Sequence, residues 1–86
     1  MKKFNQTLSA RQVFGRNLRL ARHIKEMSQE ELALRANLSR AYVSGVERGV
    51  RNVSIDNMSI LSIAVGVALR DLVDPALFPS LDNSSA

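Results

Sequence analysis

The side chains best suited to intermolecular chemistry gather between residues 28 and 52. Within this stretch Arg40 carries a guanidinium whose fork of donors matches a phosphate group or the O6 and N7 atoms of guanine. Its neighbours Ala41, Tyr42 and Ser44 supply a methyl group and two hydroxyl groups. These groups make apolar contacts and hydrogen bonds, but nothing beside them activates a nucleophile. The pattern therefore favours recognition of a polyanion over catalysis.

No side-chain pattern in the sequence points to an enzyme. Cysteine is absent, so the chain has no thiolate nucleophile. The single histidine, His23, has no nucleophile or carboxylate at a suggestive spacing, and we interpret it as a solvated helix residue. One histidine without cysteine also excludes a structural zinc site built from these two ligand types. We therefore expect no enzyme activity, no metal and no cofactor.

The composition indicates one small domain. The 86 residues are 45% apolar and 23% charged, which is typical of a globular protein, and a chain this short has a thin core. Its longest apolar stretch without charge, residues 57–69, is shorter than the roughly 20 residues of a membrane helix. No apolar signal region follows the basic N-terminus. We therefore expect a cytoplasmic protein without membrane association.

Charge is distributed unevenly along the chain. Residues 1–55 hold eleven of the twelve Lys and Arg and four of the eight acids, a net charge of +7, whereas residues 56–86 carry −3. A basic part joined to an acidic part is typical of a polyanion-binding face combined with a second face of another role. Charge alone is equally compatible with a solvated basic surface, so the choice depends on how the helices place these residues.

Helix signals recur along the chain, and the alternation of a strand is nowhere sustained. Ser9 with Gln12 and Ser28 with Glu31 form the pattern of a capping box at a helix start. Such starts and apolar residues at helical spacing predict five short helices, over residues 10–25, 29–36, 40–48, 55–65 and 68–73. The predicted inner face of the fourth helix is made of Ile55, Met58, Leu61, Ser62 and Val65.

The second and third predicted helices are joined by residues 37–39, which is the spacing of a helix-turn-helix. In that unit the later helix enters the major groove of DNA, and the N-terminus of the earlier one rests on a phosphate. Contacts with bases of double-stranded DNA are then expected from Arg40, Ala41, Tyr42 and Ser44. Contacts with phosphates are expected from Arg19, Ser28, Gln29, Ser39, Arg48, Arg51 and Asn52.

The residues of this unit resemble a known family. The strings 28–33, SQEELA, and 37–49, NLSRAYVSGVERG, are similar to the XRE-type (phage repressor and Cro-like) helix-turn-helix family. The resemblance covers about residues 10–74, and residues 42–54 are most similar to the small controller proteins of restriction–modification systems. It implies an all-α, five-helix, repressor-like domain that binds operator DNA as a symmetric dimer.

The resemblance also implies roles for individual residues. Arg22 and Glu47 would form a partly buried ion pair that orients the third helix. Glu26 and Asn37 stand where the family usually has glycine, so both are expected in left-handed turns. Asparagine tolerates that conformation well, whereas glutamate would carry strain of about 1 kcal/mol.

Three of the singled-out residues keep a second interpretation. Glu47 would then be a plain surface acid, and Arg40 would contact a phosphate instead of a base. Tyr42 would belong to the core instead of the groove, or would pack one face while its hydroxyl stays wet.

The chain is interpreted as an N-terminal arm (residues 1–9), a DNA-binding domain (10–74) and a tail (75–86). Apolar residues near the end of the domain exceed what one short helix needs. They indicate either plain core or core combined with a dimer seam, and we favour the second interpretation, with the seam formed by Leu69, Leu72, Val73 and Phe78. The homodimer would hold two third helices about 34 Å apart and read a pseudo-palindromic operator. It would repress transcription by occlusion, or activate it through a surface that touches RNA polymerase.

The alternative hypothesis is a protein-interaction module on the same fold, such as an antitoxin-like or adaptor protein. Its candidate feature is the tail, where Leu77, Phe78 and Leu81 would become ordered on a partner. A stoichiometric complex that survives high salt would favour this hypothesis over the regulator.

Overall fold

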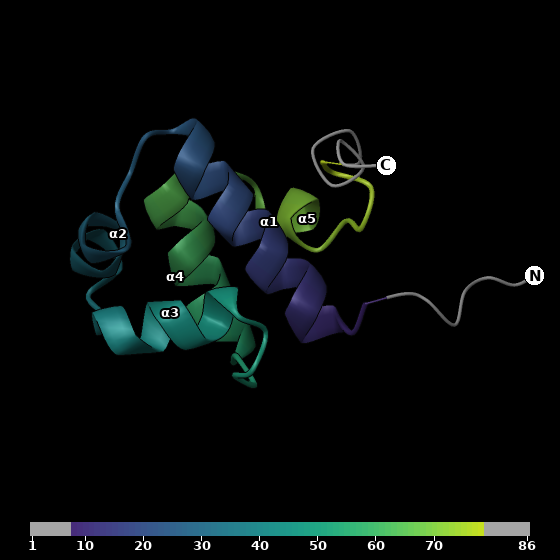
Figure 1. The fold of residues 1–86 in the computed structure, drawn as a ribbon, viewed down its shortest axis with the longest axis horizontal. Helices are drawn as coiled ribbons and strands as arrows, with labels where there is room; N and C mark the ends of the chain where they lie inside the picture. The colour runs from purple at the N-terminus through teal and green to yellow at the C-terminus, as the bar shows by residue number, and fades with distance from the viewer. Residues whose placement is uncertain (1–7, 79–86) are drawn as a thin grey trace, which may run out of the picture.

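The structure, a computed structural model, describes residues 8–78. These residues contain five α-helices joined by turns and loops. They are α1 (Ala10–Ile24), α2 (Gln29–Ala36), α3 (Arg40–Glu47), α4 (Ile55–Val65) and α5 (Leu69–Leu72). α1 crosses the middle of the molecule, with α2 and α3 on one side of it and α5 on the other (Figure 1). The predicted all-α fold is confirmed for these residues, and every helix ends within one residue of its predicted bounds. Most of the predicted arm and tail lie outside the described residues.

Four serines begin the four longer helices as predicted. The side chains of Ser9, Ser28, Ser39 and Ser54 each accept a hydrogen bond from the backbone N–H three residues on. Each bond satisfies one of the N–H groups that a helix leaves unpaired at its start. The Ser9 capping box is complete, because the Gln12 side chain accepts from the Ser9 backbone N–H in return.

The capping box predicted for Ser28 and Glu31 is wrong in its second half. Ser28 accepts the backbone N–H of Glu31 at 3.0 Å, but the Glu31 carboxylate does not return to Ser28. Instead its Oε2 accepts a hydrogen bond from Arg35 Nη2 at 2.7 Å, one helical turn further along α2. An oppositely charged partner at that spacing competes for the carboxylate.

Left-handed residues end the helices and set the angles between them. Glu26 and Asn37 both have φ of 56°, as the resemblance implies, and Gly49 and Gly66 have φ of 75° and 76°. Asn37 ends α2 and lets the chain turn sharply into α3. Glu26 adopts the same conformation with a longer side chain, which costs about 1 kcal/mol.

One hydrophobic core holds the five helices together. Its buried members are Phe14, Leu18, Ala21, Met27, Leu32, Ala33, Ala36, Val43, Val46, Leu61, Val65 and Leu72. The predicted inner face of α4 is correct for Leu61, Ser62 and Val65 but wrong for Ile55, which is 70% exposed. Ile55 is the first residue of α4, whereas Met58, one turn further on, is half-buried against the core.

The segment after α5 is fastened to α1 by two polar side chains. Asn17, which is fully buried, donates through Nδ2 to the backbone oxygens of Leu72 and Asp74 at 3.0 and 2.8 Å. Arg16 donates through Nη2 to the backbone oxygen of Phe78 at 2.9 Å. Residues 74–78 therefore lie against their own domain, with Leu77 and Phe78 half-buried on the core. Leu81 lies outside the described residues.

Candidate nucleic-acid interface

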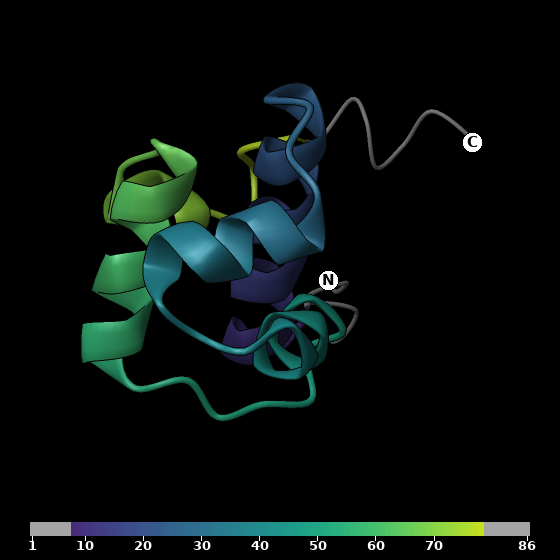
Figure 2. The same cartoon turned by 90° about the vertical axis from the view of Figure 1, so that its left-hand side faces the viewer.

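The helix-turn-helix is built from α2, the turn at residues 37–39 and α3. α2 packs between α3 and α4, and α3 lies at the edge of the molecule (Figures 1 and 2). The loop from Arg48 to Ser54 continues along the same edge before the chain enters α4 (Figure 2). This arrangement leaves one long side of α3 without a covering element among residues 8–78.

Gly15 lets α1 and α3 approach each other backbone to backbone. A Cβ atom at this position would lie 2.1 Å from the backbone oxygen of Val46 and 3.0 Å from that of Glu47. Real side chains cannot adopt such distances, so only glycine fits without a shift of one helix. The close packing of α3 against α1 therefore depends on the absence of a side chain at Gly15.

A buried ion pair fixes the C-terminal half of α3. Arg22 Nε and Nη2 donate to the two carboxylate oxygens of Glu47 at 2.7 and 2.9 Å. Arg22 Nη1 donates to the backbone oxygen of Met27 at 2.8 Å, and Gln29 Nε2 donates to Glu47 Oε1 at 3.0 Å. The side chains of Arg22 and Glu47 are only 8% and 2% exposed. The network joins α1, the turn after it, the first residue of α2 and the last residue of α3.

The predicted base-contacting residues fall into two groups. Arg40 and Ala41 are exposed at the first turn of α3, as is the capping residue Ser39. Ser44 and Tyr42 are half-buried, and the Tyr42 ring packs against the core. The structure therefore places one face of Tyr42 in the core, while the first turn of α3 is open to a ligand.

The predicted phosphate-contacting residues come from α1, from the start of α2, from the turn before α3 and from the loop after α3. Arg19, Ser28, Arg48, Arg51 and Asn52 are exposed, and Gln29 is half-buried because its amide bonds to Glu47. The hydroxyls of Ser28 and Ser39 accept a helix N–H, which leaves their O–H groups to donate elsewhere. Arg51 also lies over the ring of Tyr42, with its guanidinium carbon 5.4 Å from the ring centroid.

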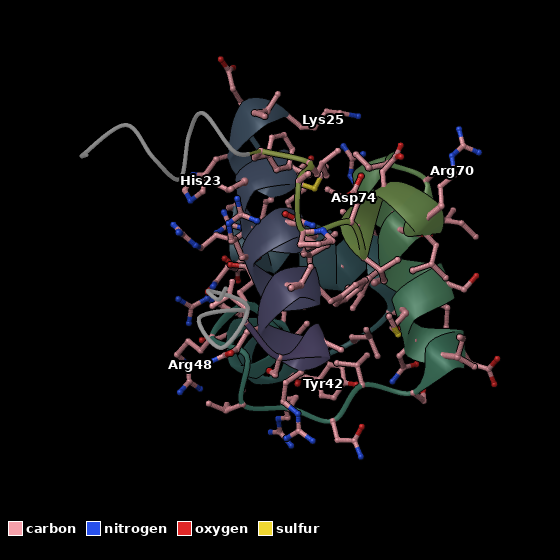
Figure 3. The ribbon with its side chains drawn as sticks, turned by 90° about the vertical axis from the view of Figure 1, so that its right-hand side faces the viewer. His23, Lys25, Tyr42, Arg48, Arg70 and Asp74 are labelled. Atoms are coloured by element: carbon pink, nitrogen blue, oxygen red, sulfur yellow. The ribbon has the colours of Figure 1, made fainter. Side chains whose placement is uncertain are left out.

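Exposed arginines gather at α3 and at the loop that follows it, where Arg40, Arg48 and Arg51 lie. Tyr42 and Arg48 lie at the end where α3 is found, whereas Arg70 and Asp74 lie toward the other end (Figure 3). Lys25 lies at that other end too, so basic side chains are present at both ends, and Asp74 lies only at the end away from α3 (Figure 3). A polyanion that approaches the domain meets its basic side at α3 and at the loop that follows.

A helix-turn-helix family matches this geometry in sequence as well. The sequence profile of that family covers residues 18–72, which include α2, α3, α4 and the connecting turns. The chain belongs to the XRE-type helix-turn-helix family. The predicted family resemblance is therefore confirmed.

Several members of this family are similar to the chain over most of its length. Control protein C.BamHI of Bacillus amyloliquefaciens is 48% identical over 69 residues, which is 79% of this chain and 85% of that protein. The structure of the restriction–modification controller protein C.AhdI from Aeromonas hydrophila has a TM-score of 0.69 at 47% identity. That match covers 72% of this chain and 94% of the C.AhdI chain.

A second similar structure contains nucleic acid. The C.Esp1396I controller protein was solved as a tetramer in complex with its natural 35 base-pair operator. It has a TM-score of 0.68 and 29% identity, over 88% of this chain and 93% of that chain. The chain thus shares its fold with proteins that are named as restriction–modification controllers, one of which was solved in complex with its operator.

Two residues of this helix-turn-helix protein play structural parts that sequence reasoning missed. Asn57, at the first turn of α4, donates through Nδ2 to the hydroxyl of Tyr42 at 3.1 Å. Asn17 holds the segment after α5. The only signal for Asn17 was its place between the apolar residues Phe14 and Leu18, on the inner side of α1. No sequence signal pairs Asn57 with Tyr42, because the contact joins different helices.

The described residues include a small hollow and no metal cluster. The hollow, of about 230 Å³, lies between the first turn of α1 and residues 52–58, with Phe14 and Met58 at its apolar side. Ligand pockets usually exceed about 300 Å³. Within residues 8–78, no three His, Asp or Glu side chains converge to hold a metal ion. In that same part of the chain, no helix is long and apolar enough to cross a membrane.

Proposed function

We propose that this protein is a transcriptional regulator that recognises a specific DNA sequence through α3 and binds a pseudo-palindromic operator as a homodimer. The observation that carries the proposal is the first turn of α3. There Arg40 and Ala41 are exposed on a helix that Gly15 and the Arg22–Glu47 ion pair hold rigidly on the domain. A fixed helix with an open N-terminal turn is what the major groove admits.

The similar proteins support a role as a controller of a restriction–modification system. C.BamHI and C.AhdI are named as control proteins, and C.Esp1396I binds its natural operator. We infer the same class of role for this chain, as a regulator and not an enzyme, acting in the cytoplasm. Occlusion of the promoter would repress a gene, and activation would require a second surface that contacts RNA polymerase.

The homodimer seam proposed from the structure differs from the one predicted from the sequence. Leu72 is fully buried in its own domain and has no surface left for a seam, whereas Leu69 and Phe78 are only half-buried on the core. Val73 remains 44% exposed, and Ile60 and Ile63, one turn apart on α4, are 39% and 77% exposed. A two-fold axis at α4 would cover these side chains with their own copies.

Replacement of Ile63 by lysine is expected to dissociate the dimer. The proposed two-fold axis would bury Ile63 of both protomers, and burial of each isoleucine contributes about 1.5–3 kcal/mol. Ile63→Lys should therefore weaken dimerisation at least about a hundredfold, which sedimentation equilibrium would measure. Leu34→Lys is the matched control, because Leu34 is 77% exposed like Ile63 but lies on α2. Equal dissociation constants for Ile63→Lys and wild type would exclude this seam.

Replacement of Arg40 by alanine is expected to remove the preference for one base pair in each half-site. A fork of two hydrogen bonds to guanine contributes about 1–3 kcal/mol of discrimination. Selection of bound duplexes from a random pool would be run with wild type and with Arg40→Ala, and both pools sequenced. The two motifs should differ at one symmetric pair of positions. An unchanged motif with uniformly weaker binding would instead make Arg40 a phosphate contact.

A further inference from the structure

A chain of contacts links α4 to the DNA-facing side of α3. Asn57 Nδ2 donates to the Tyr42 hydroxyl at 3.1 Å, and both residues are half-buried. The Tyr42 ring in turn lies under the guanidinium of Arg51, whose central carbon is 5.4 Å from the ring centroid. Asn57, Tyr42 and Arg51 come from three different elements: α4, α3 and the loop between them.

Gly45 leaves room for the side chain of Arg51. A Cβ atom at Gly45 would lie 2.9 Å from both Cγ and Nε of Arg51. The Arg51 side chain therefore lies flat against α3, across the position of Gly45 and over Tyr42. An exposed arginine ordinarily samples many rotamers, and ordering it on DNA costs free energy. Here two neighbours restrict it before any ligand arrives.

The hydrogen bond from Asn57 acts on Tyr42, which is the middle residue of the three. As an acceptor from Asn57, the Tyr42 oxygen has its orientation fixed, and its own O–H group remains to donate outward. The ring that carries this oxygen is also the surface on which Arg51 rests. Whatever holds the phenol ring in place therefore also holds the arginine beside the recognition helix.

We propose that Asn57 is a positioning residue for DNA binding, which acts through Tyr42 to pre-arrange Arg51 for its contact with the duplex. The inference rests on the proposed function, because it concerns the same DNA-binding surface. Asn57 itself does not need to touch DNA. Asn57 contributes because it orders Tyr42 and Arg51 in the free protein, so that these side chains lose less conformational entropy when DNA binds.

Double-mutant cycles on DNA affinity test the proposal. The probe is the duplex that wild type selects from a random pool, and the variants are Asn57→Ala, Tyr42→Phe and Arg51→Ala. Loss of one hydrogen bond should weaken binding by about three- to tenfold for Asn57→Ala and for Tyr42→Phe. The double variant Asn57→Ala/Tyr42→Phe should lose no more than Tyr42→Phe alone, and Asn57→Ala should add nothing to Arg51→Ala.

The matched control is Ser59→Ala, an exposed residue of the same helix, which should bind like wild type. Thermal unfolding of every variant would show that each is folded at the temperature of the titrations. Losses that multiply in the double variants would overturn the proposal, and so would an unchanged affinity of Asn57→Ala. A wild type that selects no motif would overturn the proposed function, and this inference would fall with it.

A spectroscopic measurement checks the free protein without DNA. Tyr42 is the only tyrosine of the chain, and tryptophan is absent, so the tyrosine signal reports this residue alone. The intensity ratio of the tyrosine Raman doublet depends on whether the phenol oxygen accepts a hydrogen bond. Asn57→Ala should change this ratio and Ser59→Ala should not. An unchanged ratio in Asn57→Ala would contradict the positioning role even if DNA affinity fell.

Discussion

Glu47→Ala is expected to lower the free energy of unfolding by about 3–5 kcal/mol, because it leaves the buried Arg22 guanidinium without its counter-charge. The Glu47 carboxylate accepts three hydrogen bonds, two from Arg22 and one from Gln29. Its side chain is 2% exposed, so water cannot replace these bonds. The loss is a large part of the roughly 5–15 kcal/mol that stabilises a typical domain.

Urea unfolding followed by circular dichroism would measure this loss. Glu31→Ala is the control, because the Glu31–Arg35 pair is about half exposed and contributes at most about 0.5 kcal/mol. A double variant, Arg22→Met with Glu47→Leu, should be more stable than Glu47→Ala, since it leaves no unpaired buried charge. The account is wrong if Glu47→Ala and Glu31→Ala unfold at the same urea concentration.

Gly15→Ala is expected to destabilise the domain by about 3 kcal/mol. In an exposed helix the change would stabilise by about 1 kcal/mol, because alanine is the better helix former. Here the added methyl group would lie 2.1 Å from the backbone oxygen of Val46. Backbone atoms cannot move aside as a side chain can, so α1 and α3 must separate and the core between them opens.

Gly45→Ala provides a matched comparison for Gly15→Ala. A methyl group at Gly45 would meet only the flexible side chain of Arg51, which can move. The urea midpoint of Gly45→Ala should stay near that of wild type, whereas that of Gly15→Ala should fall. A Gly15→Ala protein as stable as wild type would show that the two helices do not need their close approach.

The sequence was sufficient for the helices because their signals are local. A serine cap and the apolar residues that follow lie within one or two turns, so Ser9, Ser39 and Ser54 place three helix starts correctly. The same holds for the left-handed Asn37, whose role depends on its own backbone. Glu31 is the exception, since two local partners compete for its carboxylate and the pattern does not rank them.

Contacts between helices were harder to derive. The Arg22–Glu47 pair joins residues that are 25 positions apart, and only the family resemblance implied it. The Asn57–Tyr42 bond has no comparable signal in one sequence. Leu72 was predicted in the dimer seam but is buried in the core of its own domain. An apolar residue at helical spacing has the same pattern whether it faces its own core or a second protomer.

The central claim is that α3 reads a specific DNA sequence. It is tested most directly by the affinity of wild type for its selected duplex and for a scrambled duplex of equal length, each titrated at two salt concentrations. The account predicts a preference of at least about a thousandfold for the selected duplex, with half-sites about one helical turn apart. Equal affinities for the two duplexes, both lost as salt rises, would contradict it and reduce the basic face to a nonspecific electrostatic surface.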